Sequence, residues 1–170
     1  SMVLDRVNKI IYAALSERTC QGLLNEFCKK INFSPISFTA FQNFNQEKII
    51  YHTNVMMSVC ADFVIVCLDS IIDINEKNKV LDSLIQTKKE IIPISLEQVS
   101  NFCGNVLEVK SNTDEHLLIM STKSFNSFSK NQKKIINRFC KIVHSPLDTI
   151  EKYGGGGARC MIAEIFLNKI

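Results

Sequence analysis

The chain has 170 residues, of which 46% are hydrophobic and 22% are charged, and its formal net charge at pH 7 is +3. These values are typical of one soluble globular domain with an adequate core, not of a disordered chain. The densest basic stretch, 130–141, has apolar residues at helical spacing between its charges, which indicates a solvated helix face rather than a nucleic-acid site. No stretch approaches the ~20 apolar residues of a membrane-spanning helix.

The seven cysteines include no C-x-x-C pair and no cluster with histidine at zinc spacing. Cys28, Cys60, Cys67 and Cys140 lie within apolar runs, where a free thiol behaves as a small hydrophobic side chain. We therefore expect a reducing cytoplasmic location, no metal and no cofactor. Cys160 differs from the others because it follows a glycine run.

The first elements along the chain are a β-hairpin formed by residues 2–5 and 9–15. Thr19 is the expected N-cap of a helix that continues to about residue 30, and residues 36–41 form the next strand. The apolar residues expected on the inner face of this helix are Leu23, Leu24, Phe27 and Ile31.

The same order of elements recurs further on. Residues 48–59 and 63–70 are β-branched runs, 76–87 is an amphipathic helix, and 90–95 is a strand. The residues expected on the inner face of this second helix are Val80, Leu81, Leu84 and Ile85.

A third round begins with a hairpin formed by residues 105–109 and 116–121. It continues with a helix over 130–143 and a short strand at 148–150, and a further element over 158–167 closes the chain.

Strand, strand, helix and strand thus recur at a spacing of roughly 50 residues, which predicts an α/β fold built of three ββαβ modules with mixed strand pairing. No low-complexity linker separates the modules, so we expect a single domain. The expected modules are 1–41, 48–97 and 104–150, followed by a closing segment, 156–170.

The strongest chemical signal is the run of four glycines that ends at Gly157 and is followed by Ala158, Arg159 and Cys160. Such a run is expected where the backbone must approach a ligand or direct N–H groups at a developing charge. A cysteine beside an arginine after this loop is placed where its thiolate can be stabilised. The alternative is a flexible turn before a strand cysteine, whereas a phosphate-binding loop would need a Lys-Ser/Thr pair that is missing.

His52 is the best candidate for a base, because a cysteine nucleophile needs a group that accepts and returns a proton near neutral pH. It is also compatible with an ordinary core or strand-end histidine. His116 follows a charged turn and His144 precedes a Ser-Pro loop, so both are poorer candidates.

A Cys-His pair usually needs a carboxylate that orients the base or binds the substrate. Spacing alone does not choose among the available acids, and each is also compatible with an ordinary surface or strand-end residue. The candidates are Asp5, Asp69, Asp148, Glu151 and Glu164.

Segments 51–58, 101–108 and 155–166 together resemble the pentein superfamily. The closest branch is the bacterial amidinotransferase-like group that includes citrulline-utilisation hydrolases, whereas arginine deiminases and dimethylarginine dimethylaminohydrolases are more distant. The resemblance covers nearly the whole chain, and the Gly-Ala-Arg-Cys-Met segment is its most specific part.

The resemblance implies a five-bladed α/β propeller of ββαβ modules, of which this chain holds part. It implies hydrolysis of a guanidino or ureido group through a cysteine-bound intermediate of the thiouronium type. Cys160 is then the nucleophile and His52 the acid/base. We expect substrate contacts at Asn54, Arg159 and Gly157.

Two departures from the family pattern matter. Several pentein branches have aspartate where this chain has Asn54, and an amide cannot supply the charge that pairs with a guanidinium, although it can bind a neutral ureido group such as that of citrulline. Residues 1–5 resemble the family segment that directly follows the catalytic glutamate. We therefore expect a truncated chain with the C-terminal three modules only.

Three functions remain open at this point. The first is a hydrolase of an arginine- or citrulline-like amino acid, incomplete in this chain alone. The second is a non-catalytic remnant or interaction module, and the third is a structural α/β domain. With exposed sheet edges we expect homo-oligomers or association with a missing N-terminal half, and no nucleic acid or membrane as partner.

Overall fold

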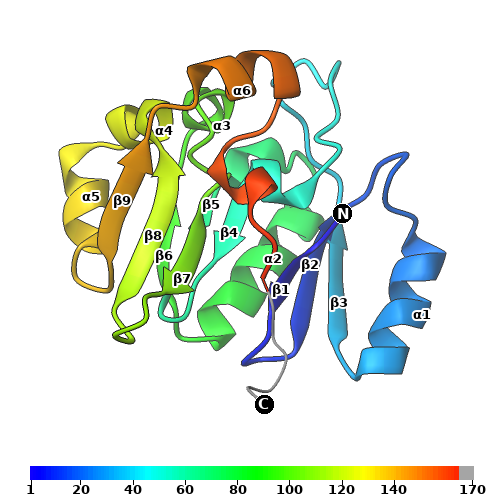
Figure 1. Cartoon of the computed structure of the whole chain (residues 1–170). Helices are drawn as coiled ribbons and strands as arrows, with labels where there is room; N and C mark the ends of the chain where they lie inside the picture. The colour runs from blue at the N-terminus through cyan, green and yellow to red at the C-terminus, as the bar shows by residue number, and fades with distance from the viewer. Residues whose placement is uncertain (165–170) are drawn as a thin grey trace.

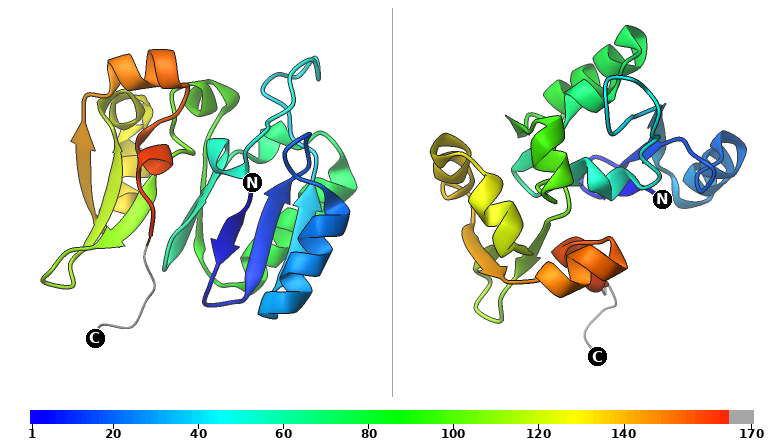
Figure 2. Two further views of the ribbon diagram at one scale, coloured as in Figure 1. Left: turned by 45° about the vertical axis from the view of Figure 1, so that its right-hand side comes forward. Right: turned by 90° about the horizontal axis from the view of Figure 1, so that it is seen from above.

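The computed structural model describes residues 1–164, and the end of the expected closing element 158–167 lies outside them. The chain folds into three units, each with one three-stranded sheet. Seen from above, these units form an arc, and α6 (Asp148–Gly154) and η3 (Ala158–Met161) lie between its two ends (Figure 2). This arc of ββαβ units is the α/β architecture expected from the recurring elements. None of the described helices is long and apolar enough to cross a membrane.

The first unit contains β1 (Val3–Asp5), β2 (Ile10–Ala14), α1 (Gln21–Ile31) and β3 (Ser34–Phe38). The expected hairpin pairs β1 with β2 antiparallel, and α1 carries the chain across so that β3 pairs with β2 in parallel (Figure 1).

Two expectations for α1 are wrong. The N-cap is Cys20, because the Thr19 hydroxyl is engaged with Ser1 instead of the helix. The inner face consists of Leu24 and Cys28. The other three apolar residues of the expected face are exposed, and they are Leu23, Phe27 and Ile31.

The second unit repeats this order with β4 (Met57–Val59), β5 (Phe63–Val66), α2 (Ile74–Gln86) and β6 (Glu90–Pro93). The sheet again combines one antiparallel and one parallel pairing. Two short 3₁₀ helices, η1 (Thr53–Val55) and η2 (Leu68–Ser70), flank its hairpin.

The expected strand over 48–59 is wrong in its first half, because η1 interrupts it and only β4 pairs with the sheet. The helix agrees better with expectation. Asp73 caps α2 by accepting two backbone N–H groups, and Val80 and Leu84 are buried. Ile85, which the helical spacing placed on the inner face, is 58% exposed.

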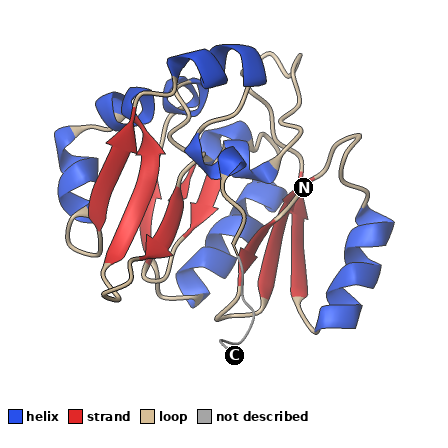
Figure 3. Ribbon diagram, in the orientation of Figure 1, coloured by secondary structure: helices blue, strands red, loops and turns tan. Residues whose placement is uncertain are grey.

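The third unit contains β7 (Leu107–Lys110), β8 (His116–Ser121), α5 (Lys130–Ile136) and β9 (Lys141–Ser145). A short helix, α3 (Leu96–Ser100), precedes the hairpin of β7 and β8, and a second one, α4 (Thr122–Ser127), follows β8. Figure 3 shows strands accompanied by helices in each of the three units.

The end of the third unit differs from the expectation. The helix expected over 130–143 ends at Ile136, and the β-branched residues Ile142 and Val143 continue as β9, parallel to β8. The expected strand at 148–150 is part of α6. Helical spacing at Ile135, Ile136 and Phe139 concealed this boundary.

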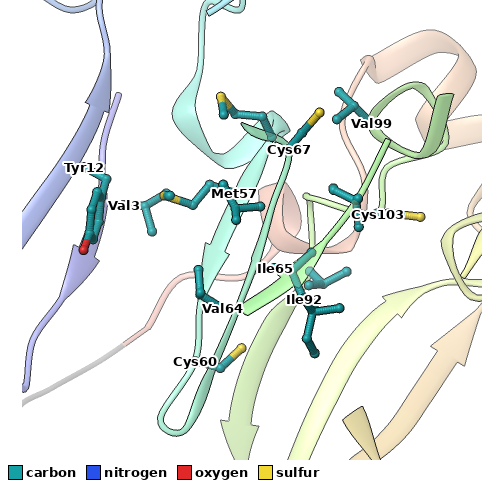
Figure 4. Close-up of a cluster of buried hydrophobic side chains, with 14 of the residues drawn as sticks. Val3, Tyr12, Met57, Cys60, Val64, Ile65, Cys67, Ile92, Val99 and Cys103 are labelled. Carbon is teal, nitrogen blue, oxygen red and sulfur yellow. The ribbon is translucent and has the colours of Figure 1, made fainter. Parts of the chain in front are cut away.

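The units share one main core. Val3 and Tyr12 from the first sheet, Met57 and Ile65 from the second, and Cys103 before the third belong to the same buried cluster (Figure 4). The helices α2 and α5 also contact the preceding unit, since α2 packs against β3 and Gln132 of α5 donates to the Pro93 carbonyl of β6. These contacts join the three units through their side chains as well as through the backbone.

Candidate active site

Cys160 lies in η3, directly after the glycine run and α6. Its side chain is exposed, and its backbone N–H donates to the Gly157 carbonyl over 3.2 Å. The glycine run therefore ends in a tight 3₁₀ turn that presents the thiol at the surface. This is the placement expected of a nucleophile that a substrate must reach.

Asn105 is the residue that holds the sulfur. Its side-chain Nδ2 lies 3.1 Å from Cys160 Sγ and also 3.1 Å from the backbone oxygen of Asn54. Its own carbonyl accepts the N–H of Arg159 over 3.3 Å. Asn105 was not singled out from the sequence, because nothing in its neighbourhood distinguishes a buried asparagine from a turn residue.

Gly104 explains how Asn105 reaches η1. A Cβ built on Gly104 would lie 2.4 Å from the carbonyl oxygen of Val55 and 2.8 Å from the carbonyl carbon of Met56. Only glycine allows two backbone segments to approach so closely. The loop before β7 is thereby pressed against the segment that carries Asn54.

His52 is the N-cap residue of η1 and is half-buried. Its ring Nε2 lies 3.1 Å from a guanidinium nitrogen of Arg18, and the Arg18 guanidinium lies over the ring of Tyr51 at 4.9 Å. A guanidinium only donates, so Nε2 accepts and the ring is neutral, with its proton on Nδ1. Burial and the charge of Arg18 lower the pKa of His52 from its usual value, which keeps the ring available as a base.

Among the described residues, Cys160 and His52 are not hydrogen-bonded to each other, and only an indirect link joins them. Cys160 is linked to Asn105, Asn105 to the backbone of Asn54, and Asn54 is two residues from His52. Asn54 is half-buried, and its side-chain oxygen is buried without a hydrogen-bond partner among the described residues. Arg18, another residue not singled out from the sequence, completes this group.

Gly157, the last residue of the glycine run, packs closely against Asn105 and Phe102. A Cβ at this position would lie 3.0 Å from Asn105 Oδ1 and 3.2 Å from Phe102 Cβ. Oδ1 is buried and has no hydrogen-bond partner in the part of the chain that the structure describes. Leaving such an acceptor unpaired costs about 1–3 kcal/mol. The contacts that Asn105 does make are those of Nδ2 with Cys160 Sγ and with the Asn54 backbone oxygen.

Arg159 does not contact the sulfur. Its guanidinium lies 3.7 Å from a Glu164 carboxylate oxygen and 3.5 Å from the Ile162 carbonyl. It lines a cavity of about 730 Å³ between β1, β4 and β7, together with Asp5, Lys89 and Glu108, and Cys160 is not part of this lining. A substrate contact at Arg159 stays a prediction.

The contacts of three of the candidate acids do not include His52. Asp5 pairs with buried Lys89 over 3.7 Å, and Asp69 pairs with Lys77 over 3.2 Å. Glu151, in α6, is buried with both carboxylate oxygens unpartnered among residues 1–164. Across these residues no carboxylate is hydrogen-bonded to the His52 ring, and the identity of the acid stays open.

The other two histidines are engaged elsewhere. His116 pairs with Glu108, and His144 stacks on Phe125 with 4.1 Å between ring centroids. Within the described range, no group of three His, Cys, Asp or Glu side chains could hold a metal ion.

Comparison with known proteins identifies the family of the chain. Residues 1–167 match the family model described as N,N dimethylarginine dimethylhydrolase, eukaryotic. The chain belongs to this family, and with it to the pentein superfamily of guanidino-modifying enzymes. The matching model belongs to the dimethylarginine branch, which was expected from the sequence to be a more distant relative. No curated protein matches the chain.

Solved structures of pentein enzymes share the fold. The ternary complex of AgrE with ornithine and NAD+ is 17% identical over 99% of this chain, with a TM-score of 0.72, and 23% of that chain is covered. The N-terminal domain of ArgZ, a cyanobacterial arginine dihydrolase bound to product, is 20% identical over 94% of this chain (TM-score 0.69), with 52% of that domain covered. An agmatine deiminase from C. jejuni is 9% identical over 94% of this chain (TM-score 0.51), with 52% of it covered. The chain thus spans about half of the ArgZ domain.

Proposed function

We propose that this chain carries the cysteine and histidine of a hydrolase that acts on the guanidino or ureido group of an arginine- or citrulline-like amino acid. The observation that carries the proposal is the exposed Cys160 sulfur, held by Asn105, whose amide also binds the segment that carries His52. Membership of a family of guanidino-modifying enzymes supports the substrate class. A covalently bound reaction intermediate is described for the ArgZ N-terminal domain.

In the proposed reaction the Cys160 thiolate attacks the guanidino carbon and forms a C–S bond. The C–N bond to the leaving amine breaks as that nitrogen takes a proton from protonated His52, and a thiouronium remains on the sulfur. Water then attacks the same carbon and gives its proton to neutral His52. The C–S bond breaks, the ureido product leaves and the thiolate is restored.

The low pKa of His52 suits the second half of this cycle, because a neutral ring can accept the proton of water. In the first half His52 must hold the proton taken from the thiol. Arg18, exposed beside the ring, also provides a cation for the carboxylate of an amino-acid substrate. Asn54 would contact the reacting group, and its unpartnered side-chain oxygen can accept an N–H.

The test is hydrolysis of arginine, dimethylarginine and citrulline by the chain and by Cys160→Ala. We expect turnover to fall at least about a thousandfold in Cys160→Ala, because no other group in the proposed site can form the covalent bond. Cys20→Ala is the matched control, since Cys20 is the other exposed cysteine. Activity that survives in Cys160→Ala would contradict the role of Cys160 as nucleophile. Activity that is absent from the wild-type chain supplied with the complementary modules of a relative would favour a non-catalytic module.

We further propose that the chain works in association with another ββαβ module, which packs on α1. In the second unit, Ser83 directly precedes buried Leu84. Its hydroxyl is hydrogen-bonded to the hydroxyl of Tyr12 in the first unit over 2.9 Å. In the third unit, Phe139 directly precedes buried Cys140 and stacks on Phe63 of the second, with 5.5 Å between ring centroids.

In α1 the two residues that directly precede the buried residues are apolar and at least partly exposed. Leu23 directly precedes buried Leu24, and Phe27 directly precedes buried Cys28, yet Leu23 is 68% and Phe27 40% exposed. By the repeat, this face of α1 fits the sheet of one more module. At the other end of the arc, Val143 of β9 is 39% exposed.

A second copy of the chain can supply such a sheet, so association is measurable by analytical ultracentrifugation. We expect concentration-dependent oligomers that disappear in the double variant Leu23→Glu/Phe27→Glu, while Val7→Glu, at an 81% exposed turn position, leaves them unchanged. A wild-type chain that stays monomeric at high concentration, or oligomers that persist in the double variant, would contradict this proposal. The free cysteines fit a reducing compartment such as the cytoplasm.

A further inference from the structure

We propose that Asn105 sets the reactivity of Cys160, because its side-chain N–H holds the sulfur and stabilises the thiolate. The inference rests on the proposed function for the role of Cys160 as nucleophile. Its starting point is the 3.1 Å distance between Asn105 Nδ2 and Cys160 Sγ. Nothing in the chemistry of the Cys-His pair alone requires this residue.

The orientation of the Asn105 amide is fixed by its other contacts. Nδ2 also donates to the backbone oxygen of Asn54 over 3.1 Å, so both of its hydrogens have an acceptor. A flipped amide would place Oδ1 against that backbone oxygen, two acceptors facing each other. The N–H therefore points at the sulfur in the resting protein.

Burial makes this donor effective. Asn105 is 3% exposed, and its backbone oxygen accepts the N–H of Arg159, the neighbour of Cys160. A donor held rigidly and away from water stabilises a nearby negative charge more strongly than water does. The exposed sulfur can meet a substrate on one side while Asn105 holds it on the other.

The absence of a side chain at Gly157 leaves room for the Asn105 amide. Any side chain at 157 would meet Asn105 Oδ1 at 3.0 Å and Phe102 Cβ at 3.2 Å. The unpartnered Oδ1 shows that the amide is not there to satisfy its own acceptor. The last glycine of the run is thus needed so that Asn105 can reach Cys160, and not only for a turn.

The test is the pH dependence of iodoacetamide alkylation at Cys160, followed peptide by peptide by mass spectrometry. In Asn105→Asp we expect alkylation of Cys160 near neutral pH to slow roughly tenfold, because the donor to the sulfur is lost and a carboxylate beside it disfavours the thiolate. Asn105→Leu, which removes the donor without adding charge, should shift the profile in the same direction. Alkylation at Cys20, the other exposed thiol, should stay unchanged in every variant.

Asn101→Asp is the matched control, since the Asn101 side chain donates to the Glu97 carbonyl and not to Cys160. If the Asn105 variants do not fold, Gly157→Ala is expected to slow Cys160 alkylation by pushing the amide away from the sulfur. A Cys160 profile equal to wild type in folded Asn105→Asp and Asn105→Leu would overturn the inference and leave Asn105 a purely structural link. Alkylation needs no turnover, so loss of the proposed hydrolase activity would not affect this outcome.

Discussion

A guanidinium nitrogen of Arg18 lies 3.1 Å from Nε2 of His52, and the two residues come from different units of the fold. Arg18 follows β2 in the first unit, whereas His52 precedes η1 in the second. The contact places a permanent positive charge against the proposed acid/base, and its consequences can be measured directly.

The first prediction concerns the titration of His52. Arg18→Ala should raise the pKa of His52 toward 6.5, because one of the causes that lower it is removed, while burial of the ring remains. An NMR titration of the His52 ring protons measures this shift. Arg18→Lys, which keeps the charge, is the control. An unchanged pKa in Arg18→Ala would show that Arg18 does not contribute and that burial and the nearby N-terminal charge are responsible.

The same shift sets the sign of a pH effect on stability. Since the pKa of His52 is lower in the folded than in the unfolded state, the unfolded chain binds more protons as pH falls below about 6.5. The contribution of His52 to the free energy of unfolding is therefore full above that pH, and it is lost as pH falls toward the folded pKa. Urea unfolding of wild type and His52→Gln at pH 7.5 and 5.5 tests this, and the loss should be smaller in the variant.

The second prediction concerns Gly104. Gly104→Ala should lower the free energy of unfolding by about 2–3 kcal/mol, because the new methyl group would lie 2.4 Å from the Val55 carbonyl oxygen and the backbone must separate. Gly22→Ala is the control. Its Cβ meets nothing closer than 3.9 Å, and alanine within α1 should be stabilising by up to ~1 kcal/mol. Equal effects of the two substitutions in urea unfolding would contradict the close approach.

The third prediction concerns the contact between the first and second units. Tyr12→Phe and Ser83→Ala should each cost about 1–2 kcal/mol, since each leaves a buried hydroxyl without its partner. The double variant should cost less than the sum, with a coupling of about 1 kcal/mol. Strictly additive values from thermal or urea unfolding would mean that the hydroxyl pair does not link the units.

The fourth prediction concerns thiol reactivity in the native chain. Cys20 and Cys160 should be alkylated, whereas burial raises the pKa of both Cys103 and Cys140 to about 12. Near pH 7.5 that alone reduces their thiolate fraction by about three orders of magnitude relative to an ordinary cysteine. Peptide mapping after brief iodoacetamide treatment measures the order, and denatured protein is the control. Rapid native labelling of Cys103 would indicate that the core around it opens.

Part of the fold was accessible from the sequence because it depends on local patterns. The hairpin of β1 and β2, the helix α2 and the hairpin of β7 and β8 each follow from residue spacing and turn residues. The boundary between α5 and β9 was not accessible. Ile135 and Ile136 fit a helix that continues, and only the parallel pairing of β9 with β8 makes Lys141–Ser145 a strand.

The candidate site shows the same division. Glycines before Cys160 and an isolated His52 are unusual as local features, so the sequence alone identified both. Asn105 and Arg18 are ordinary residues in ordinary surroundings until the fold brings them to the sulfur and the imidazole.

By itself the sequence determined the recurring ββαβ order, the family resemblance and the two residues with conspicuous chemistry, since each depends on neighbours along the chain. Tertiary structure decided which face of α1 is buried, which segment forms the last strand and which side chains touch Cys160 and His52. Those outcomes depend on contacts between different elements of the fold, and the contacts of Arg18 with His52 and of Asn105 with Cys160 join residues more than thirty positions apart. No local pattern encodes a distance in space.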